Sequence, residues 1–389
     1  MKCWLLSLVF LATVVTLETA VLAQNGPADF ESLSRQAAAA LQSNPTEAIG
    51  LYRKALASQP SWAEGWFYLA ASLYQTGAYP ESREAFQQAA KLAPDNGTVW
   101  AFLGFCEYQT GDFAGALADI KKGESLGLGD NRAFISTVRN RAALIHLRSS
   151  DYGAAMEQLG PLARLGDDSD TTINALGVGA LGLPYLPTDV PAQDKGLVHL
   201  AGQAAWAMAA QRADDTAKLS KQLVERYPKQ PGVHYLYGIY LLSDHPDEAL
   251  IQFQKELQVR PSHVPARLQI ATLKLKSGDP QEAIGMAKQA LEIQPNNPFC
   301  YIALGRALLG KGQVQEAVPE LEAAAKIAPQ DPQPHFYLEQ AYRRLSRTAD
   351  ALKEKEQFAR LKAAQDPLVL PNFNQASMSN QQSTGSAHQ

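Results

Sequence analysis

Residues 264–329 read VPARLQIATLKLKSGDPQEAIGMAKQALEIQPNNPFCYIALGRALLGKGQVQEAVPELEAAAKIAP and contain two copies of one 34-residue unit. Small residues and a closing proline recur at the same places in both copies. The first copy places there Ala271, Gly278, Ala283, Ala290 and Pro295, and the second places there Gly305, Gly312, Ala317, Ala324 and Pro329. A fixed period of this length indicates that one supersecondary unit is repeated along the chain.

Each copy predicts two helices joined by a short turn. In the second copy, apolar residues recur with the spacing of one helix face over residues 298–310 and again over residues 313–327. Gly312 lies in the break between these runs. Pro329 has no amide hydrogen and cannot continue a helix, so it ends the unit.

Three small residues of the second copy are predicted to lie where its helices cross. Gly305, Ala317 and Ala324 fall on the apolar faces, and a larger side chain there would hold the helix axes apart. A single helix pair buries too little apolar surface to be stable, so the copies must stack on one another.

The 34-residue period, with small residues at three helix sites and proline at the close, resembles the tetratricopeptide repeat. The match covers roughly residues 29–364, with about five strong copies and four weak ones. The resemblance implies an all-α fold, a right-handed α-solenoid of helix-turn-helix repeats. It predicts amino-terminal repeats at 29–167 and carboxy-terminal repeats at 196–364, the latter closed by a charged capping helix.

Residues 168–195 interrupt the period. A glycine-rich apolar segment is followed there by Pro184, Pro187 and Pro191, a density of proline that breaks regular structure. We predict an irregular glycine- and proline-rich insertion, in which a degenerate helix precedes a surface loop, at the joint between the two arrays. Residues 365–389 are polar and predict a disordered tail.

The first residues are typical of a secretory signal peptide. Lys2 supplies the positive start, an apolar run extends from Leu5 to Val15, and small residues precede a cleavage site after Ala23. The apolar run is too short to span a bilayer. We therefore expect removal of residues 1–23, a secreted or periplasmic protein, and no stable membrane span after cleavage. The alternative is an uncleaved interfacial anchor.

Composition and cysteine content disfavour several classes of protein. There are 35 Lys and Arg against 39 Asp and Glu, without a long basic run, which argues against nucleic-acid binding. Cys106 and Cys300 lie several repeats apart and are predicted to be buried and unpaired. The seven histidines show no zinc-binding spacing, so we expect no metal site and no cofactor.

Two short motifs invite a catalytic interpretation. Residues 123–127 read GESLG, the pattern of a hydrolase nucleophile elbow around Ser125, and residues 177–182 read GVGALG, the pattern of a dinucleotide-binding turn. Both motifs require a preceding β-strand. Since the surrounding sequence predicts helical repeats, we expect no catalysis, and a serine hydrolase using Ser125 is the least favoured alternative.

The resemblance also implies where a partner binds. Proteins with these repeats hold a peptide or a partner helix in a concave groove lined by the first helix of each repeat. Transferred by repeat position, the groove residues are Phe67, Tyr74, Phe105, Tyr108, Tyr235, Ile302, Arg306, Phe336, Arg343 and Arg344. The competing interpretation is that many of these rings pack between repeats.

The resulting hypothesis is a non-catalytic scaffold that binds a protein or peptide partner outside the cytoplasm. Arg306, Arg343 and Arg344 favour an acidic or carboxylate-bearing partner at the carboxy-terminal end of the groove. The principal alternative is self-assembly into a homo-oligomer through incompletely capped terminal repeats.

Overall fold

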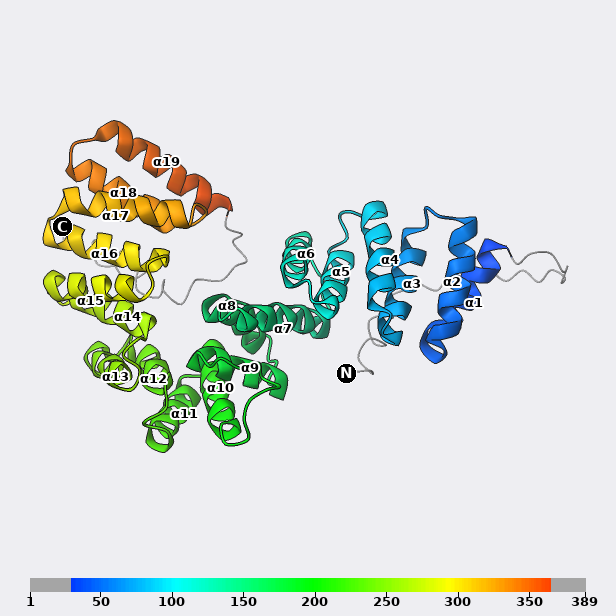
Figure 1. The fold of residues 1–389 in the computed structure, drawn as a ribbon, viewed down its shortest axis with the longest axis horizontal. Coiled ribbons are helices and arrows are strands. Elements are labelled where there is room, and N and C mark those ends of the chain that lie inside the picture. Colours follow the sequence, from blue (N-terminus) through cyan, green and yellow to red (C-terminus); the bar gives the residue numbers. More distant parts are fainter. Residues whose placement is uncertain (1–28, 365–389) are drawn as a thin grey trace, which may run out of the picture. The chain divides into compact units, whose positions relative to one another are not determined.

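The computed structural model describes residues 29–364, and their regular structure is entirely α-helical. The predicted signal peptide at 1–23 and the predicted tail at 365–389 lie outside the described residues. Nineteen helices follow one another along the described chain (Figure 1). They are α1 (Phe30–Ser43), α2 (Pro45–Ser58), α3 (Ala63–Thr76), α4 (Tyr79–Leu92), α5 (Gly97–Thr110), α6 (Phe113–Leu126), α7 (Arg132–Arg148), α8 (Tyr152–Arg164), α9 (Asp170–Leu181), α10 (Lys195–Ala209), α11 (Ala213–Arg226), α12 (Val233–Leu241), α13 (Pro246–Val259), α14 (Val264–Lys276), α15 (Pro280–Ile293), α16 (Pro298–Lys311), α17 (Val314–Ile327), α18 (Pro332–Arg344) and α19 (Thr348–Ala364).

Apart from α9, these helices form consecutive pairs of the kind the sequence predicts. In most pairs the first helix packs against the second, which then packs against the first helix of the next pair. The prediction of an all-α fold built from stacked helical repeats is confirmed. The chain divides into two compact units, and the division falls within α9.

Unit 1 comprises residues 29–175 and 184–188 of the described chain. Its core is rich in aromatic rings that pass from one repeat to the next. Phe102 of α5 stacks on Phe86 of α4 at a centroid separation of 5.5 Å and on Phe134 of α7 at 5.1 Å. Because such pairs add attraction beyond the area they bury, these three rings tie successive repeats together.

Unit 2 comprises residues 176–183 and 189–364 of the described chain, and small and aliphatic residues dominate its core. A Cβ atom added at Gly305 of α16 would lie 2.5 Å from Leu321 Cγ of α17. Ala317 and Ala324 of α17 are fully buried. The predicted close crossing of these two helices is therefore confirmed.

The turns between helices follow from local sequence. Gly111 and Gly312 end α5 and α16 in the left-handed region, with φ of 85° and 83°, which a residue with a side chain rarely adopts. Asn96 caps α5, because its side-chain oxygen accepts from the amides of Thr98 and Val99. These local signals place the repeat boundaries where the sequence predicts them.

The segment 168–195, predicted to be an irregular insertion with a degenerate helix, contains a regular helix of 12 residues, α9. Its glycine-rich half is helix α9, in which Ala175, Leu176 and Val178 are fully buried. A Cβ atom at Gly177 would lie 2.0 Å from the carbonyl oxygen of Val198 in α10. Gly177 thus allows two helices to approach closely. The non-helical residues of the segment are 168–169 and the proline-bearing half, 182–194.

Within residues 29–364, no helix is long and apolar enough to cross a bilayer. Cys106 and Cys300 are free, and both are fully buried, as predicted. Burial raises the pKa of the Cys106 thiol to about 12 and that of Cys300 to about 11, so both remain protonated at neutral pH.

Candidate partner-binding surface

The predicted groove residues of unit 1 occupy different environments. Phe67 is half-buried and meets the rings of Phe86 and Phe102 edge-on, each at 5.6 Å. Phe105 is only 3% exposed and lies against Phe102 and Phe134. Since a ring so deeply buried packs between repeats, Phe105 is a core residue and does not line an accessible groove.

Unit 2 shows the same division. Ile302 is 3% exposed and belongs to the core. Tyr235 contacts the rings of Phe253 and His263, and burial raises the pKa of its hydroxyl to about 12. Phe336 is half-buried and packs 5.6 Å from Phe358 of the last helix. Tyr235 and Phe336 stabilise the stack, because each contacts a ring beyond its own helix.

The three arginines predicted to attract a carboxylate all have partners within unit 2. Arg306 lies 5.3 Å above the Tyr337 ring, and Arg343 forms an ion pair with Glu339 at 3.5 Å. Arg344 Nη1 donates to the carbonyl oxygen of Leu309 at 2.8 Å. The Arg343–Glu339 pair lies within α18, at positions four residues apart. The contacts of Arg306 and Arg344 join different helices, so the sequence alone does not reveal them.

Unit 1 holds a cluster that the sequence predicts only in part. The sequence predicts Tyr74 and Tyr108 and does not predict the two arginines beside them. We call this cluster the aromatic–arginine row. It consists of Tyr74, Tyr79, Tyr108, Phe113, Arg141 and Arg148.

The row is built from the same aromatic pair in successive repeats. Tyr74 of α3 meets Tyr79 of α4 at 5.2 Å, and 34 residues later Tyr108 of α5 meets Phe113 of α6 at 5.5 Å, both in edge-to-face geometry. Gln109 joins the two repeats, because its amide nitrogen donates to the Tyr74 hydroxyl at 3.2 Å. The period of the chain thus creates a continuous strip of partly exposed rings.

Helix α7 adds positive charge to this strip. The Arg141 guanidinium lies 4.3 Å above the Tyr108 ring, and that of Arg148 lies 4.6 Å above Phe113. Neither arginine forms an ion pair with any residue in the range 29–364. Burial raises the pKa of the Tyr74 hydroxyl, and the charge of Arg141 partly offsets that rise. The row therefore offers aromatic surface together with two cations that lack a carboxylate partner in the described chain.

Neither catalytic motif has the geometry its chemistry requires. Ser125 lies in the last turn of α6, where its hydroxyl donates to the carbonyl oxygen of Lys122 at 2.8 Å, and no strand occurs in the described residues. The GVGALG motif lies at the end of the buried helix α9, where its glycines serve helix packing. The arrangement around Ser125 does not form an oxyanion hole, and the arrangement at residues 177–182 does not form a pyrophosphate site.

Two of the described histidines, His234 and His263, serve helix packing and capping. His234 hydrogen-bonds to Gln252 at 2.7 Å, and His263 Nδ1 accepts from the Ala266 amide at the start of α14. Burial and the nearby charge of Arg260 lower the pKa of His263 to about 3, which keeps this cap neutral. Within residues 29–364, no group of three His, Cys, Asp or Glu side chains is placed to hold a metal ion.

No curated protein matches the chain. Among solved structures, MamA from Desulfovibrio magneticus RS-1 is 19% identical, with a TM-score of 0.40 over 44% of this chain and 97% of the other. Another crystal structure of MamA is 15% identical, with a TM-score of 0.38 over 41% of this chain and 95% of the other.

Two sequence profiles described as tetratricopeptide repeat match the chain. One matches residues 37–97 and 69–125, and the other matches residues 274–335. Residues 37–125 of unit 1 and residues 274–335 of unit 2 therefore match the tetratricopeptide repeat, a repeat type whose stacked helices provide extended surfaces for protein interaction.

Proposed function

We propose that this protein is a non-catalytic scaffold whose aromatic–arginine row binds an acidic segment of a partner protein. The observation that supports the proposal most directly is the pair of guanidinium groups of Arg141 and Arg148, which stack on Tyr108 and Phe113 without a carboxylate partner in the described chain. Stacking fixes each guanidinium while leaving its N–H donors available for a carboxylate.

The aromatic rings supply the rest of the binding surface. Tyrosine and arginine are the residues that most often dominate the energy of protein interfaces, since they combine apolar area with polar groups. Tyr74, Tyr79 and Tyr108 present that combination over two successive repeats. An extended or helical segment carrying both acidic and apolar side chains has the matching chemistry.

The proposal includes a location outside the cytoplasm. It rests on the signal-like residues 1–23, with Lys2, the apolar run and the cleavage site after Ala23. Amino-terminal sequencing of the protein from a secreted or periplasmic fraction tests this part. A mature chain that starts at Gln24 supports it, and a chain found only in the cytoplasm with its first residues intact contradicts it.

Binding is tested with a labelled peptide of alternating glutamate and leucine and a matched peptide with glutamine in place of glutamate. We expect the wild-type protein to bind the glutamate peptide more tightly. The double variant Arg141→Gln, Arg148→Gln should weaken that binding at least about 5-fold, the effect of roughly 1 kcal/mol of surface electrostatics. Fluorescence anisotropy measures both affinities.

Arg306→Gln in unit 2 is the control, because it removes a stacked arginine outside the row. Equal affinity for the two peptides, or an equal loss in the control, would contradict the proposal. Sedimentation across a range of concentrations separates partner binding from the alternative of self-assembly, since only self-assembly makes the apparent mass rise with concentration.

A further inference from the structure

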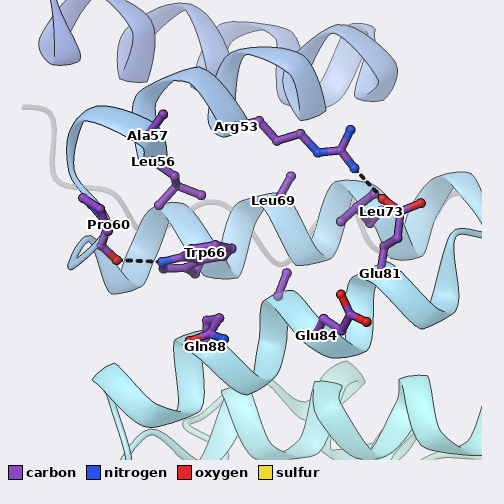
Figure 2. A pocket seen from close by; sticks show the side chains of 11 residues that line it. Arg53, Leu56, Ala57, Pro60, Trp66, Leu69, Leu73, Glu81, Glu84 and Gln88 are labelled. Atoms are coloured by element: carbon purple, nitrogen blue, oxygen red, sulfur yellow. Dashed lines mark hydrogen bonds and ion pairs between the residues drawn. The ribbon is translucent and has the colours of Figure 1, made fainter.

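A second surface of unit 1, distinct from the row, lies between α2 and α4. An open groove with a volume of about 520 Å³ lies there, and residues of α3 line it between those of α2 and α4. Figure 2 shows the side chains that line it. Leu56, Leu69 and Leu73 give it an apolar lining, and Trp66 lies at one end. We call it the Trp66 groove.

The groove is apolar along its floor and negative at its rim. Glu81 and Glu84 of α4 line it, and Arg53 of α2 forms an ion pair with Glu81. Glu84 forms no ion pair with any residue in the range 29–364. The Trp66 indole N–H donates to the Pro60 carbonyl oxygen at 2.8 Å, which fixes the ring.

The next repeat contains the same groove position, and there the chain fills it with its own side chain. Trp100, 34 residues after Trp66, donates its indole N–H to the Pro94 carbonyl oxygen, also at 2.8 Å. The ammonium of Lys122 lies 3.3 Å from the centroid of the Trp100 ring. Burial raises the pKa of Asp119, and the positive charge of Lys122 partly offsets that rise.

The residue at the position of Lys122 in the earlier repeat is Gln88, which lines the Trp66 groove. Glutamine is shorter than lysine and carries no charge. Within residues 29–364, no cation lies over the Trp66 ring. The Trp66 groove therefore has the ring and the carboxylates of an ammonium site and lacks the ammonium that its counterpart holds.

We propose that the Trp66 groove binds a lysine side chain of a partner protein, with the ammonium over the Trp66 ring and beside Glu84. The aliphatic part of the lysine would lie along Leu69 and Leu73. The attraction combines the negative face of an indole ring, the strongest aromatic partner for a cation, with a carboxylate that lacks an internal partner. This site shares no residue with the aromatic–arginine row, so its test is independent of the proposed function.

The proposal is tested on the full chain, with the tryptophan indole N–H groups observed by NMR. The probe is Nα-acetyl-lysine methylamide, and the matched control is the norleucine analogue, which has the same carbon chain without the ammonium. Trp66→Phe and Trp100→Phe assign the two resonances. We expect the lysine probe to shift the Trp66 resonance in a saturable manner and the norleucine probe to shift it much less.

Two exchanges of the homologous residues give opposite predictions. Gln88→Lys places an internal ammonium in the groove and should weaken probe binding at Trp66 by about 5-fold or more. Lys122→Gln empties the neighbouring position, so the Trp100 resonance should begin to shift with the probe. Glu84→Gln should weaken binding at Trp66 by about 3-fold to 5-fold, and Glu292→Gln, an exposed change in unit 2, should leave it unaltered.

Three results would overturn the proposal. They are equal shifts with both probes, the absence of a saturable shift at Trp66, and unchanged binding in the Gln88→Lys variant. An unchanged circular dichroism spectrum and an unchanged thermal unfolding profile of unit 1 confirm that each variant is folded, so a loss of binding then reports on the groove.

Discussion

The Trp66 and Trp100 positions are built by the same residues of neighbouring repeats and differ in what fills them. Both indoles donate to a proline carbonyl oxygen at 2.8 Å. Around Trp66 the chain places Leu73 and Gln88, whereas around Trp100 it places Glu107 and Lys122 at the corresponding positions. The repeat therefore conserves the backbone arrangement, and a few substitutions turn an open apolar groove into a charged position occupied from within.

The largest effect on the free energy of unfolding is expected at a position where the α3–α4 and α5–α6 pairs differ in how closely their helices pack. Gly104 of α5 corresponds to Ala70 of α3, and a Cβ atom at Gly104 would lie 2.8 Å from the Ala116 carbonyl oxygen and 2.9 Å from Ile120 Cγ1. Gly104→Ala should therefore lower the free energy of unfolding by about 1–3 kcal/mol. Urea denaturation measures the change.

The same substitution at an open helical site is the control. Nothing lies within 4 Å of a Cβ atom at Gly50 of α2, so Gly50→Ala should stabilise unit 1 by about 0.5–1 kcal/mol through helix propensity. If Gly104→Ala were as stabilising as Gly50→Ala, the close crossing of α5 and α6 would be incorrect.

The second-largest effect on stability concerns Glu107 of α5, the acidic residue at the position that Leu73 occupies in α3. Burial, followed by repulsion from Asp119, raises the pKa of Glu107 from 4.5 to about 7. Because the pKa in the folded state lies above that in the unfolded state, Glu107 contributes stability that is fully present below pH 4.5 and is lost as the pH rises through about 7.

Glu107→Leu should remove this pH dependence. At pH 8 the variant should exceed the wild type in stability by about 1–2 kcal/mol, because it no longer buries a carboxylate that is charged at that pH. Near pH 4.5 the two proteins should differ much less. Leu73→Glu should introduce a similar pH dependence of stability into the repeat formed by α3 and α4. Urea denaturation at the two pH values would contradict this account if the wild type and Glu107→Leu lost stability in parallel.

The smallest expected effect on stability comes from the Lys122 ammonium, which lies over the Trp100 ring. Lys122→Gln should lower the stability of unit 1 by about 0.5–1 kcal/mol, and Gln88→Lys should raise it by a similar amount, since an exposed cation over an indole contributes on that scale. Thermal unfolding measures both changes. Changes of the same sign in the two variants would show that Gln88 and Lys122 do not occupy equivalent positions.

The sequence predicts the small residues at helix crossings more reliably than it predicts the residues of a groove. Small residues such as Gly305 and Ala317 could be assigned from the sequence, because helix crossings select for size at a fixed spacing. Groove residues could not be separated from core residues in this way. Phe105 and Tyr108 both lie on α5, but Phe105 is buried and Tyr108 is half-buried, a difference set by the neighbouring repeat.

Arg141 and Arg148 could not be identified from the period. Helix α7 has 17 residues where α5 has 14, so the repeat register no longer relates their positions to those of the earlier repeats. Their contacts with Tyr108 and Phe113 exist only once α7 has packed beside the two preceding helices.

Local sequence signals are sufficient to specify the helices, the repeat length and most helix ends. Apolar periodicity, left-handed glycines such as Gly312 and helix-breaking prolines act over a few residues and can be read locally. The packing of the repeats, in contrast, sets which aromatic rings are buried, which arginines lack a carboxylate partner in the described chain, and which groove is open. Those properties depend on the distance and alignment of helices from different repeats, because a side chain finds its partner only after the helices have stacked.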